Sequence, residues 1–444
     1  MRNRSPRLVA AKAGQSERLI ESMTQVAARH GYSGASVARV VEAAGVSRAT
    51  FYQHFADKEA CFLAAFRQAA ERIELDLPRV EAEYSPALRP GELLDDLLAN
   101  IARGPAAARI LLVEALAGGP QARAAHEGFM QMMGATFERW LEGPGENGYR
   151  LEISGRAIME GTGGILLMRS FRGETARLAD LRDDLVAWMY SYGVPEKTPR
   201  ITPARWSQLG TGLSGKPDVQ SRTAAKLPRG RSAVAPEAVA GEHRERILKA
   251  VAQLAKTKGY TAMTVADIVS AGSVTREAFY ELFRSKEDAF LAAQAVGLEE
   301  SISRTAAGFF AGENWPARVW DGLEALLGYV ALQPDLVYLD VIESYAAGAA
   351  AIRRSFDNRM AYTLFLEDGY RQTPAAGRLP RLCSEAVSHA IIGLMRWQVI
   401  EGRTEQMLEL LPEAAYLALT PFIGPATAIE FVEAKAAGES VRRG

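Results

Sequence analysis

Five polar side chains of the kinds that hydrogen bond to nucleic acids lie close together near the start of the chain. They are Arg48, Thr50, Tyr52, Gln53 and His54. Arginine and glutamine can bond to the edges of guanine and adenine, while hydroxyl groups are suited to phosphate oxygens. Phe51 and Phe55 interrupt the set at helical spacing. The pattern predicts a short helix with one buried face and one polar face that can read bases.

The residues around this helix would hold it in place. Ser47 can cap a helix over 48–55, and Ser36 can cap an earlier helix over 37–44. Gly45 supplies the tight turn between them, because glycine adopts positive φ freely. Two short helices joined in this way form a helix-turn-helix, whose second helix fits the major groove.

The chain contains a second copy of this segment. Residues 18–62 and 246–290 align without a gap at an offset of 228, with 17 identities in 45 positions. Unrelated sequences of ordinary composition would give roughly 3. A weaker echo downstream pairs Leu112-Val113-Glu114 with Val341-Ile342-Glu343. The second half is therefore a copy of the first.

Both segments resemble the DNA-binding heads of the TetR family of bacterial regulators. The resemblance rests on residues 44–55 with Asp57-Lys58-Glu59, and on residues 274–283 with Ser285-Lys286-Glu287. It implies an all-α fold of two tandem units. Each unit has an N-terminal three-helix helix-turn-helix head and a helical effector-binding and dimerisation body. It also implies that Tyr52 and Lys58 contact the DNA backbone.

We divide the chain accordingly. The segments are a basic N-terminal arm (1–15), a first head (16–62), a first body (63–196), a linker (197–241), a second head (242–290), a second body (291–424) and a C-terminal tail (425–444). The linker is rich in proline and carries eight Lys or Arg against two acids. As a flexible chain it would span about 35–40 Å, comparable to the roughly 34–36 Å between successive half-sites on DNA.

The second head is the weaker DNA-binding candidate. Glu277 and Glu281 lie on its prospective recognition helix, where they would repel phosphates. Its glycine, Gly272, comes one place early and leaves Ser273 at the turn. The residues predicted to contact DNA are Ser36, Ser47, Arg48, Thr50, Tyr52, Gln53, His54 and Lys58 in the first copy, and Thr264, Thr275, Arg276, Tyr280 and Lys286 in the second.

In the family, a four-helix interface between bodies forms the dimer, and a small ligand between the helices of a body changes the spacing of the heads. Small residues such as Gly161, Gly164 and Gly393 would let such helices approach closely. We expect an intramolecular pseudo-dimer, with pairing between separate chains as the alternative. The candidate effector-binding residues are Glu114, His126, Trp140, Glu343, His389 and Trp397.

Composition narrows the function classes. The 444 residues carry a net charge of −1 and two cysteines, and no membrane-length apolar run, signal peptide, metal-ligand cluster or catalytic motif is recognisable. We therefore expect a cytoplasmic, nucleoid-associated protein without a cofactor, apart from an unidentified small-molecule effector.

The predicted function is a ligand-responsive repressor that binds a palindromic or pseudo-palindromic operator in double-stranded DNA. The alternative is a small-molecule-binding or protein-interaction module in which one or both heads no longer bind DNA.

Overall fold

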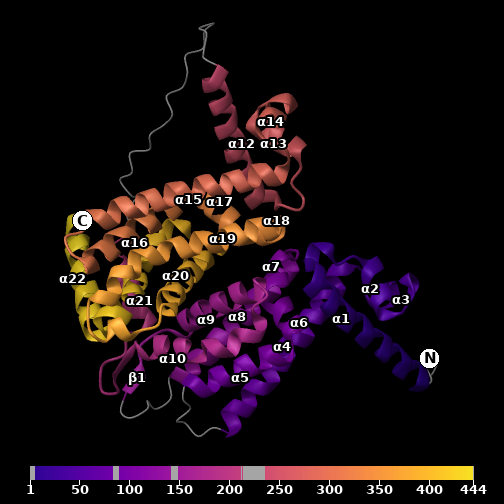
Figure 1. The fold of residues 1–444 in the computed structure, drawn as a ribbon, viewed down its shortest axis with the longest axis horizontal. Helices are drawn as coiled ribbons and strands as arrows, with labels where there is room; N and C mark the ends of the chain where they lie inside the picture. The colour runs from indigo at the N-terminus through magenta and orange to yellow at the C-terminus, as the bar shows by residue number, and fades with distance from the viewer. Residues whose placement is uncertain (1–5, 84–89, 142–148, 212, 214–235, 444) are drawn as a thin grey trace. The chain divides into compact units, whose positions relative to one another are not determined.

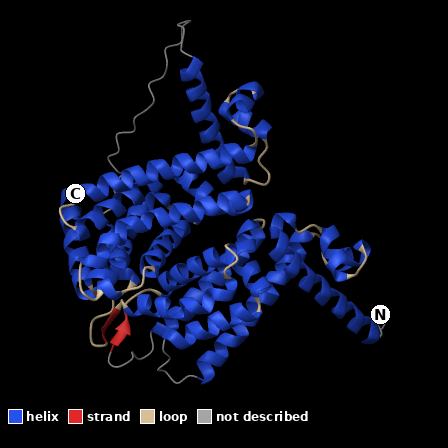
Figure 2. Ribbon diagram, in the orientation of Figure 1, coloured by secondary structure: helices blue, strands red, loops and turns tan. Residues whose placement is uncertain are grey.

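The computed structural model describes residues 6–83, 90–141, 149–211, 213 and 236–443. They fall into two compact units. Unit 1 is Met1–Arg200 with Tyr370–Gly393 and Thr420–Pro425, and unit 2 is Ile201–Gly369 with Leu394–Leu419 and Ala426–Gly444. Helices make up almost all of the described chain, as Figure 2 shows. The predicted all-α class is therefore confirmed.

The first head has the predicted order of helices (Figure 1). These are α1 (Pro6–Gly34), α2 (Val37–Ala44), α3 (Arg48–His54) and α4 (Lys58–Glu83). The helix expected over 37–44 has those bounds, and the next ends one residue earlier than expected. Gly45 adopts the left-handed conformation at φ 63°. Leu19, Val40 and Phe51 are fully buried, so the apolar periodicity predicts the core of this head correctly.

The first body continues from α4, a helix that crosses the head–body boundary. Its helices are α5 (Pro90–Arg103), α6 (Pro105–Arg109), the π-helical η1 (Ile110–Glu114), α7 (Ala115–Ala117), α8 (Pro120–Leu141), α9 (Gly155–Phe171), η2 (Thr175–Leu181) and α10 (Arg182–Tyr190). Two short antiparallel strands, β1 (Tyr149–Leu151) and β2 (Gly193–Pro195), pair with Arg150 opposite Val194. Nothing in the sequence analysis predicted this ribbon.

The second copy repeats this order. Its head has α12 (Pro236–Lys258), α13 (Val265–Gly272), α14 (Arg276–Leu282) and α15 (Lys286–Ala311). There follow α16 (Trp315–Leu332), α17 (Pro334–Tyr338), the π-helical η3 (Leu339–Glu343), α18 (Ser344–Ala347), α19 (Ala349–Tyr362), η4 (Thr363–Arg371), η5 (Ala376–Arg378), α20 (Leu382–Ile400), η6 (Thr404–Leu410) and α21 (Leu411–Ile423).

Two segments predicted as linker and tail hold packed helices instead. α11 (Pro203–Thr211) lies inside the expected linker, and its Trp206 ring lies 5.2 Å from that of Tyr416. α22 (Pro425–Arg443) occupies the expected tail and buries an apolar stripe at 428, 432 and 436. In α22, the four-residue spacing of apolar side chains on one face is the sequence signal that indicates a packed helix.

The small residues expected at the dimer interface lie where helices pack closely inside unit 1. A Cβ atom built on Gly164 would lie within 3 Å of the His389 side chain, and one on Gly161 would lie 3.0 Å from the carbonyl oxygen of Ala386. Arg169 Nη2 on α9 and Glu385 Oε2 on α20 form an ion pair of 3.0 Å. These contacts tie α9 to the first part of α20.

Among the residues that the structure describes, no single helix has the length and hydropathy needed to cross a membrane. One bent pair, Trp315–Leu332 with Pro334–Ala347, passes the same criteria together across a bend of 96°. The described residues also contain no group of three or more His, Cys, Asp or Glu side chains placed to hold a metal ion.

The turn of the second head is the more strained of the two. Ser273 occupies the position of Gly45 and adopts φ 48°, which costs an L-residue about 1–2 kcal/mol. Glycine would remove that cost, partly offset by the roughly 0.5–1 kcal/mol of chain entropy that glycine loses on folding. We expect Ser273→Gly to raise the free energy of opening this head by about 0.5–1 kcal/mol.

The measurement is hydrogen exchange of backbone amides in α13 and α14. The matched control is Gly45→Ser, which should lower the opening free energy of the first head by a similar amount. Faster exchange in the second head of Ser273→Gly would contradict the assignment of strain to this residue.

Candidate nucleic-acid interface

The exposed face of α3 carries the predicted reading residues. The hydroxyl of Ser47 caps the helix by accepting from the backbone N–H of Thr50 at 3.0 Å, and it also bonds to the Thr50 hydroxyl at 2.9 Å. Arg48, Tyr52 and Gln53 are exposed. Phe51, on the opposite face, is fully buried and fixes the orientation of the helix. The arrangement leaves an arginine, a tyrosine and an amide available to an outside partner.

Two further predicted residues of this head contribute to its local structure. Ser36 accepts from the backbone N–H of Arg39 at 3.3 Å and so caps α2. His54 is half-buried at the end of α3, with its ring 6.4 Å from that of Phe55. Thr50, whose hydroxyl bonds to Ser47, is also half-buried. These side chains can support the reading face whether or not they touch DNA.

In the second head, α14 has the same caps and a different surface. Thr275 accepts from the backbone N–H of Ala278 at 3.2 Å, and Thr264 forms a reciprocal capping box at the start of α13. The guanidinium of Arg276 lies 5.7 Å from the ring centroid of the exposed Tyr280. Glu277 and Glu281 are exposed on this helix. α14 therefore has the cap and the exposed face expected of a recognition helix, and this face carries both basic and acidic side chains.

The two predicted phosphate-binding lysines both turn inward. Lys58 Nζ donates to the carbonyl oxygen of Tyr32 at 3.1 Å and lies 3.9 Å from the centroid of the Tyr32 ring. Lys286 Nζ donates to the carbonyl oxygen of Tyr260 at 2.8 Å and lies 4.3 Å from that ring centroid. Burial lowers the pKa of both lysines. In this structure they brace the loop before the helix-turn-helix, and their contact with phosphate stays a prediction.

A buried carboxylate joins each head to its body at the same loop. Glu114 Oε2 accepts from the backbone N–H of Tyr32 at 2.7 Å. Glu343 Oε2 accepts from the backbone N–H of Tyr260 at the same distance. Each tyrosine follows a glycine with positive φ, and each glutamate ends a π-helix. We call these contacts the head–body clamps.

The clamp of the first copy has a second partner inside the body. Glu114 Oε1 accepts from Arg109 Nε at 3.0 Å. Burial nevertheless raises the pKa of Glu114, because removal from water costs the charged form more than its hydrogen bonds return. Burial therefore destabilises the charged form of Glu114, while its two oxygens accept hydrogen bonds from Tyr32 and Arg109.

Sequence reasoning assigned both glutamates to effector binding and missed the clamps. The signal was present: the two Glu residues and the two Gly-Tyr pairs recur at nearly the same offset. The sequence alone does not show that each glutamate lies within hydrogen-bond distance of a tyrosine 82 or 83 residues away.

The other predicted effector residues are dispersed. His126 is buried on α8, with Nδ1 3.7 Å from Glu127 Oε1, and His389 is buried on α20 beside Gly164. Trp140 and Trp397 are half-buried at the ends of helices. These four side chains lie on α8 and α20.

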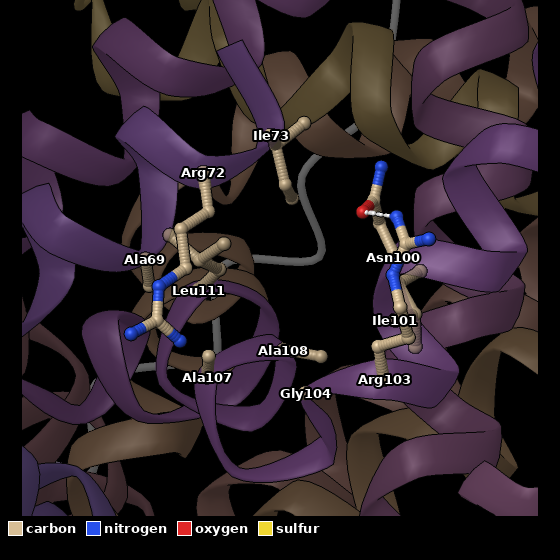
Figure 3. Close-up of a pocket in the computed structure, with 10 residues that line it drawn as sticks. All are labelled: Ala69, Arg72, Ile73, Asn100, Ile101, Arg103, Gly104, Ala107, Ala108 and Leu111. Carbon is tan, nitrogen blue, oxygen red and sulfur yellow. Dashed lines mark hydrogen bonds between the residues drawn. The ribbon is translucent and has the colours of Figure 1, made fainter. Parts of the chain in front are cut away.

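The first body holds a cavity of about 520 Å³ that the sequence did not reveal. Figure 3 shows ten of the residues that line it, from α4, α5, α6, η1 and the turn between α5 and α6. Ala107, Ala108 and Leu111 form an apolar wall, and Arg103 donates a hydrogen bond to Asn100 Oδ1 at another side. The volume is in the range of small-molecule sites. None of the predicted effector residues is among these ten.

The raised pKa of Glu114 generates a test of the first clamp. The folded protein holds a proton at this group more tightly than the unfolded chain does. The contribution of Glu114 to stability therefore falls as the pH rises from the ordinary value of 4.5 through the raised folded value. Glu114→Gln removes this dependence, so the stability of the variant relative to the parent should improve as the pH rises over that window.

Urea denaturation across the window measures the difference. Glu71→Gln, a replacement at an exposed residue of α4, controls for the loss of one negative charge. A flat or falling difference between Glu114→Gln and the parent would sink the inference that burial dominates at this carboxylate.

Comparisons with known proteins agree with this geometry. The family model described as bacterial regulatory proteins of the tetR family matches the chain twice, over residues 19–65 and 247–293. HTH-type transcriptional repressors named AcnR from Corynebacterium efficiens and Corynebacterium glutamicum are each 44% identical over 57 residues. Those matches cover 13% of this chain and 30% of each repressor, so the chain spans less than a third of these relatives.

A solved structure of a TetR-family transcriptional regulator from Syntrophomonas wolfei is 18% identical, with a TM-score of 0.33. It covers 45% of this chain and 96% of that protein. The two family matches coincide with the two helix-turn-helix heads described above. The chain therefore carries the N-terminal domain of the tetR family of bacterial regulatory proteins twice, in tandem.

Proposed function

We propose that this protein is a sequence-specific transcriptional repressor that binds double-stranded DNA with two heads in one chain and releases it in response to a small ligand. The observation that carries the proposal is the outward face of α3. There Arg48, Tyr52 and Gln53 are exposed over a fully buried Phe51. Because a helix presented in this way fits the major groove, these side chains can reach base edges and phosphates. Such a role places the protein with the chromosome in the cytoplasm.

The proposal includes pairing of the two copies within the chain. The ion pair between Arg169 and Glu385 joins α9 to α20, and the side chain of His389 packs against Gly164. The sequence resemblance assigns these helices to the interface that normally joins two subunits. Their packing inside unit 1 supports a chain that does alone what two copies of a single-headed protein do.

A second candidate concerns the second head alone. The exposed Glu277 and Glu281 favour a scaffold that no longer binds DNA, since two carboxylates beside Arg276 would oppose phosphates. The shared clamp, in which Glu343 holds Tyr260, favours a head that still couples to its body. We retain DNA binding by both heads as the proposal, because the caps and the exposed Arg276 and Tyr280 are kept.

Selection of the purified full chain against a random duplex pool tests this proposal. We expect enrichment of two unlike half-sites about one helical turn apart, with one 48.2 kDa chain bound to each duplex. A symmetric palindrome occupied by two chains would overturn the intramolecular pairing. Absence of enrichment at low salt, with folded protein and no added ligand, would overturn DNA binding altogether.

Matched arginine variants divide the binding between the heads. Arg48→Ala should weaken binding to the selected site by about 1–3 kcal/mol and relax the base preference in one half-site. Arg276→Ala should do the same in the other half-site. Fluorescence anisotropy at several salt concentrations measures both effects and the number of phosphate contacts. If Arg276→Ala binds like the parent, the second head is a scaffold.

A further inference from the structure

The two bodies can be compared position by position near the cavity. α5 and α16 end at Arg103 and Leu332, and η1 and η3 end at Glu114 and Glu343, so the offset is 229 in both places. The intervening residues Gly104 and Gln333 have nearly the same backbone angles, φ −132° and −125°. α4 and α15 correspond at the offset of 228 that relates the heads. Each residue that lines the cavity therefore has a defined counterpart in the second body.

In the first body, short side chains leave the volume open. Ala69 on α4 and Ala107 on α6 face it, with Asn100 on α5 at another side. Neither alanine reaches beyond its Cβ atom, which accounts for the cavity between three helices.

In the second body, larger side chains take these places. Tyr329 stands where Asn100 does and is buried, and Leu336 stands where Ala107 does. A Cβ atom built on Gly297, the counterpart of Ala69, would lie 3.6 Å from Leu336 Cβ and 3.7 Å from Tyr329 Oη. These are ordinary contact distances. The glycine is covered by the two larger side chains, so the matched volume is filled.

The second body also has a hydrogen-bonded polar cluster at a position that is apolar in the first. Asp340, the counterpart of the cavity residue Leu111, accepts from Gln294 Nε2 at 2.8 Å and from Asn358 Nδ2 at 3.2 Å. The residues that correspond to Gln294 and Asn358 are Phe66 and Phe129, whose rings lie 6.3 Å apart. The same position is thus apolar in one body and a hydrogen-bonded polar cluster in the other.

Charge differs at the cavity as well. Arg72 and Arg103 line the first cavity, and none of the ten described lining residues is acidic. Their counterparts in the second body are Glu300 and Leu332. A ligand with an apolar body and one negative charge therefore matches the first cavity, with the charge near the guanidinium groups.

We propose that the protein binds one apolar organic anion per chain, in the first body, and that the second body has given up the equivalent site. The inference rests on the proposed ligand response and specifies where the ligand binds and how many bind. Leu111 in the cavity wall lies in the same π-helix as Glu114, which clamps the first head. A ligand that favours one arrangement of this helix would change the hold on one head only.

Two fluorescent probes that differ only in charge test the site. Anilinonaphthalene sulfonate carries the anion, and phenylnaphthylamine has the same rings without it. We expect the sulfonate to saturate at one molecule per chain and to bind about tenfold more tightly than the neutral amine. Saturation at two per chain, or equal affinity for the two probes, would overturn the proposal.

Exchange of residues between the bodies locates the site. Ala107→Leu introduces the side chain found in the second body and should weaken sulfonate binding at least about tenfold. Ala102→Leu, the same enlargement at an exposed residue of α5 that is not among the ten lining residues, is the matched control and should bind like the parent. Unchanged binding to a folded Ala107→Leu chain, verified by circular dichroism, would place the probe elsewhere and refute the site.

A third variant keeps the inference testable if Ala107→Leu does not fold. Arg72→Gln removes one guanidinium from an exposed position and should narrow the difference in affinity between the two probes. Operator binding is measured separately on the same proteins. If probe binding fails while DNA binding persists, only this inference falls; if DNA binding fails while one probe binds per chain, only the proposed repressor function falls.

Discussion

The buried carboxylate behind each head is the contact on which the rest of the arrangement depends. A glycine with positive φ lies inside the first helix of the first head and directly after the first helix of the second head. The N–H of the next residue, Tyr32 or Tyr260, donates to Glu114 or Glu343 of the body. A buried backbone donor without an acceptor would cost the fold about the energy of a lost hydrogen bond. Lysine closes the other side of the loop by donating to the carbonyl of the same tyrosine. Head and body are therefore joined by a bond from the main chain of the tyrosine to a glutamate side chain, and substitution of the tyrosine side chain would leave that bond in place.

The position of the clamp within a π-helix gives it functional meaning. In η1 and η3 the backbone departs from regular α-helical hydrogen bonding, and such segments commonly occur at functional sites. In the first copy, Leu111 of η1 lines the cavity. Glu114, the last residue of η1, accepts the hydrogen bond from Tyr32 of the head. A change in helical register there would alter both contacts, which is the route by which the proposed ligand would act on the proposed binding of the operator.

Duplication within one chain allows the copies to diverge, which identical subunits cannot do. The second head keeps its caps and its clamp but acquires Ser273 at a strained turn and two acids on α14. The second body keeps its helices but fills with Tyr329 and Leu336 the space that the first leaves open. Scaffold features are retained in both copies, while surface charge and cavity volume differ.

The sequence by itself determined the local structure of the heads and the tandem repeat, because caps, turns and apolar periodicity act within a few residues. The range of α2, the left-handed turn at Gly45 and the burial of Phe51 followed from neighbours in the chain. Contacts between distant residues were decided only by the tertiary structure. Helix packing decides the inward turn of Lys58, the bond between Tyr32 and Glu114, and the cavity beside Ala107. The type of a residue does not show which distant residues will contact it in the fold.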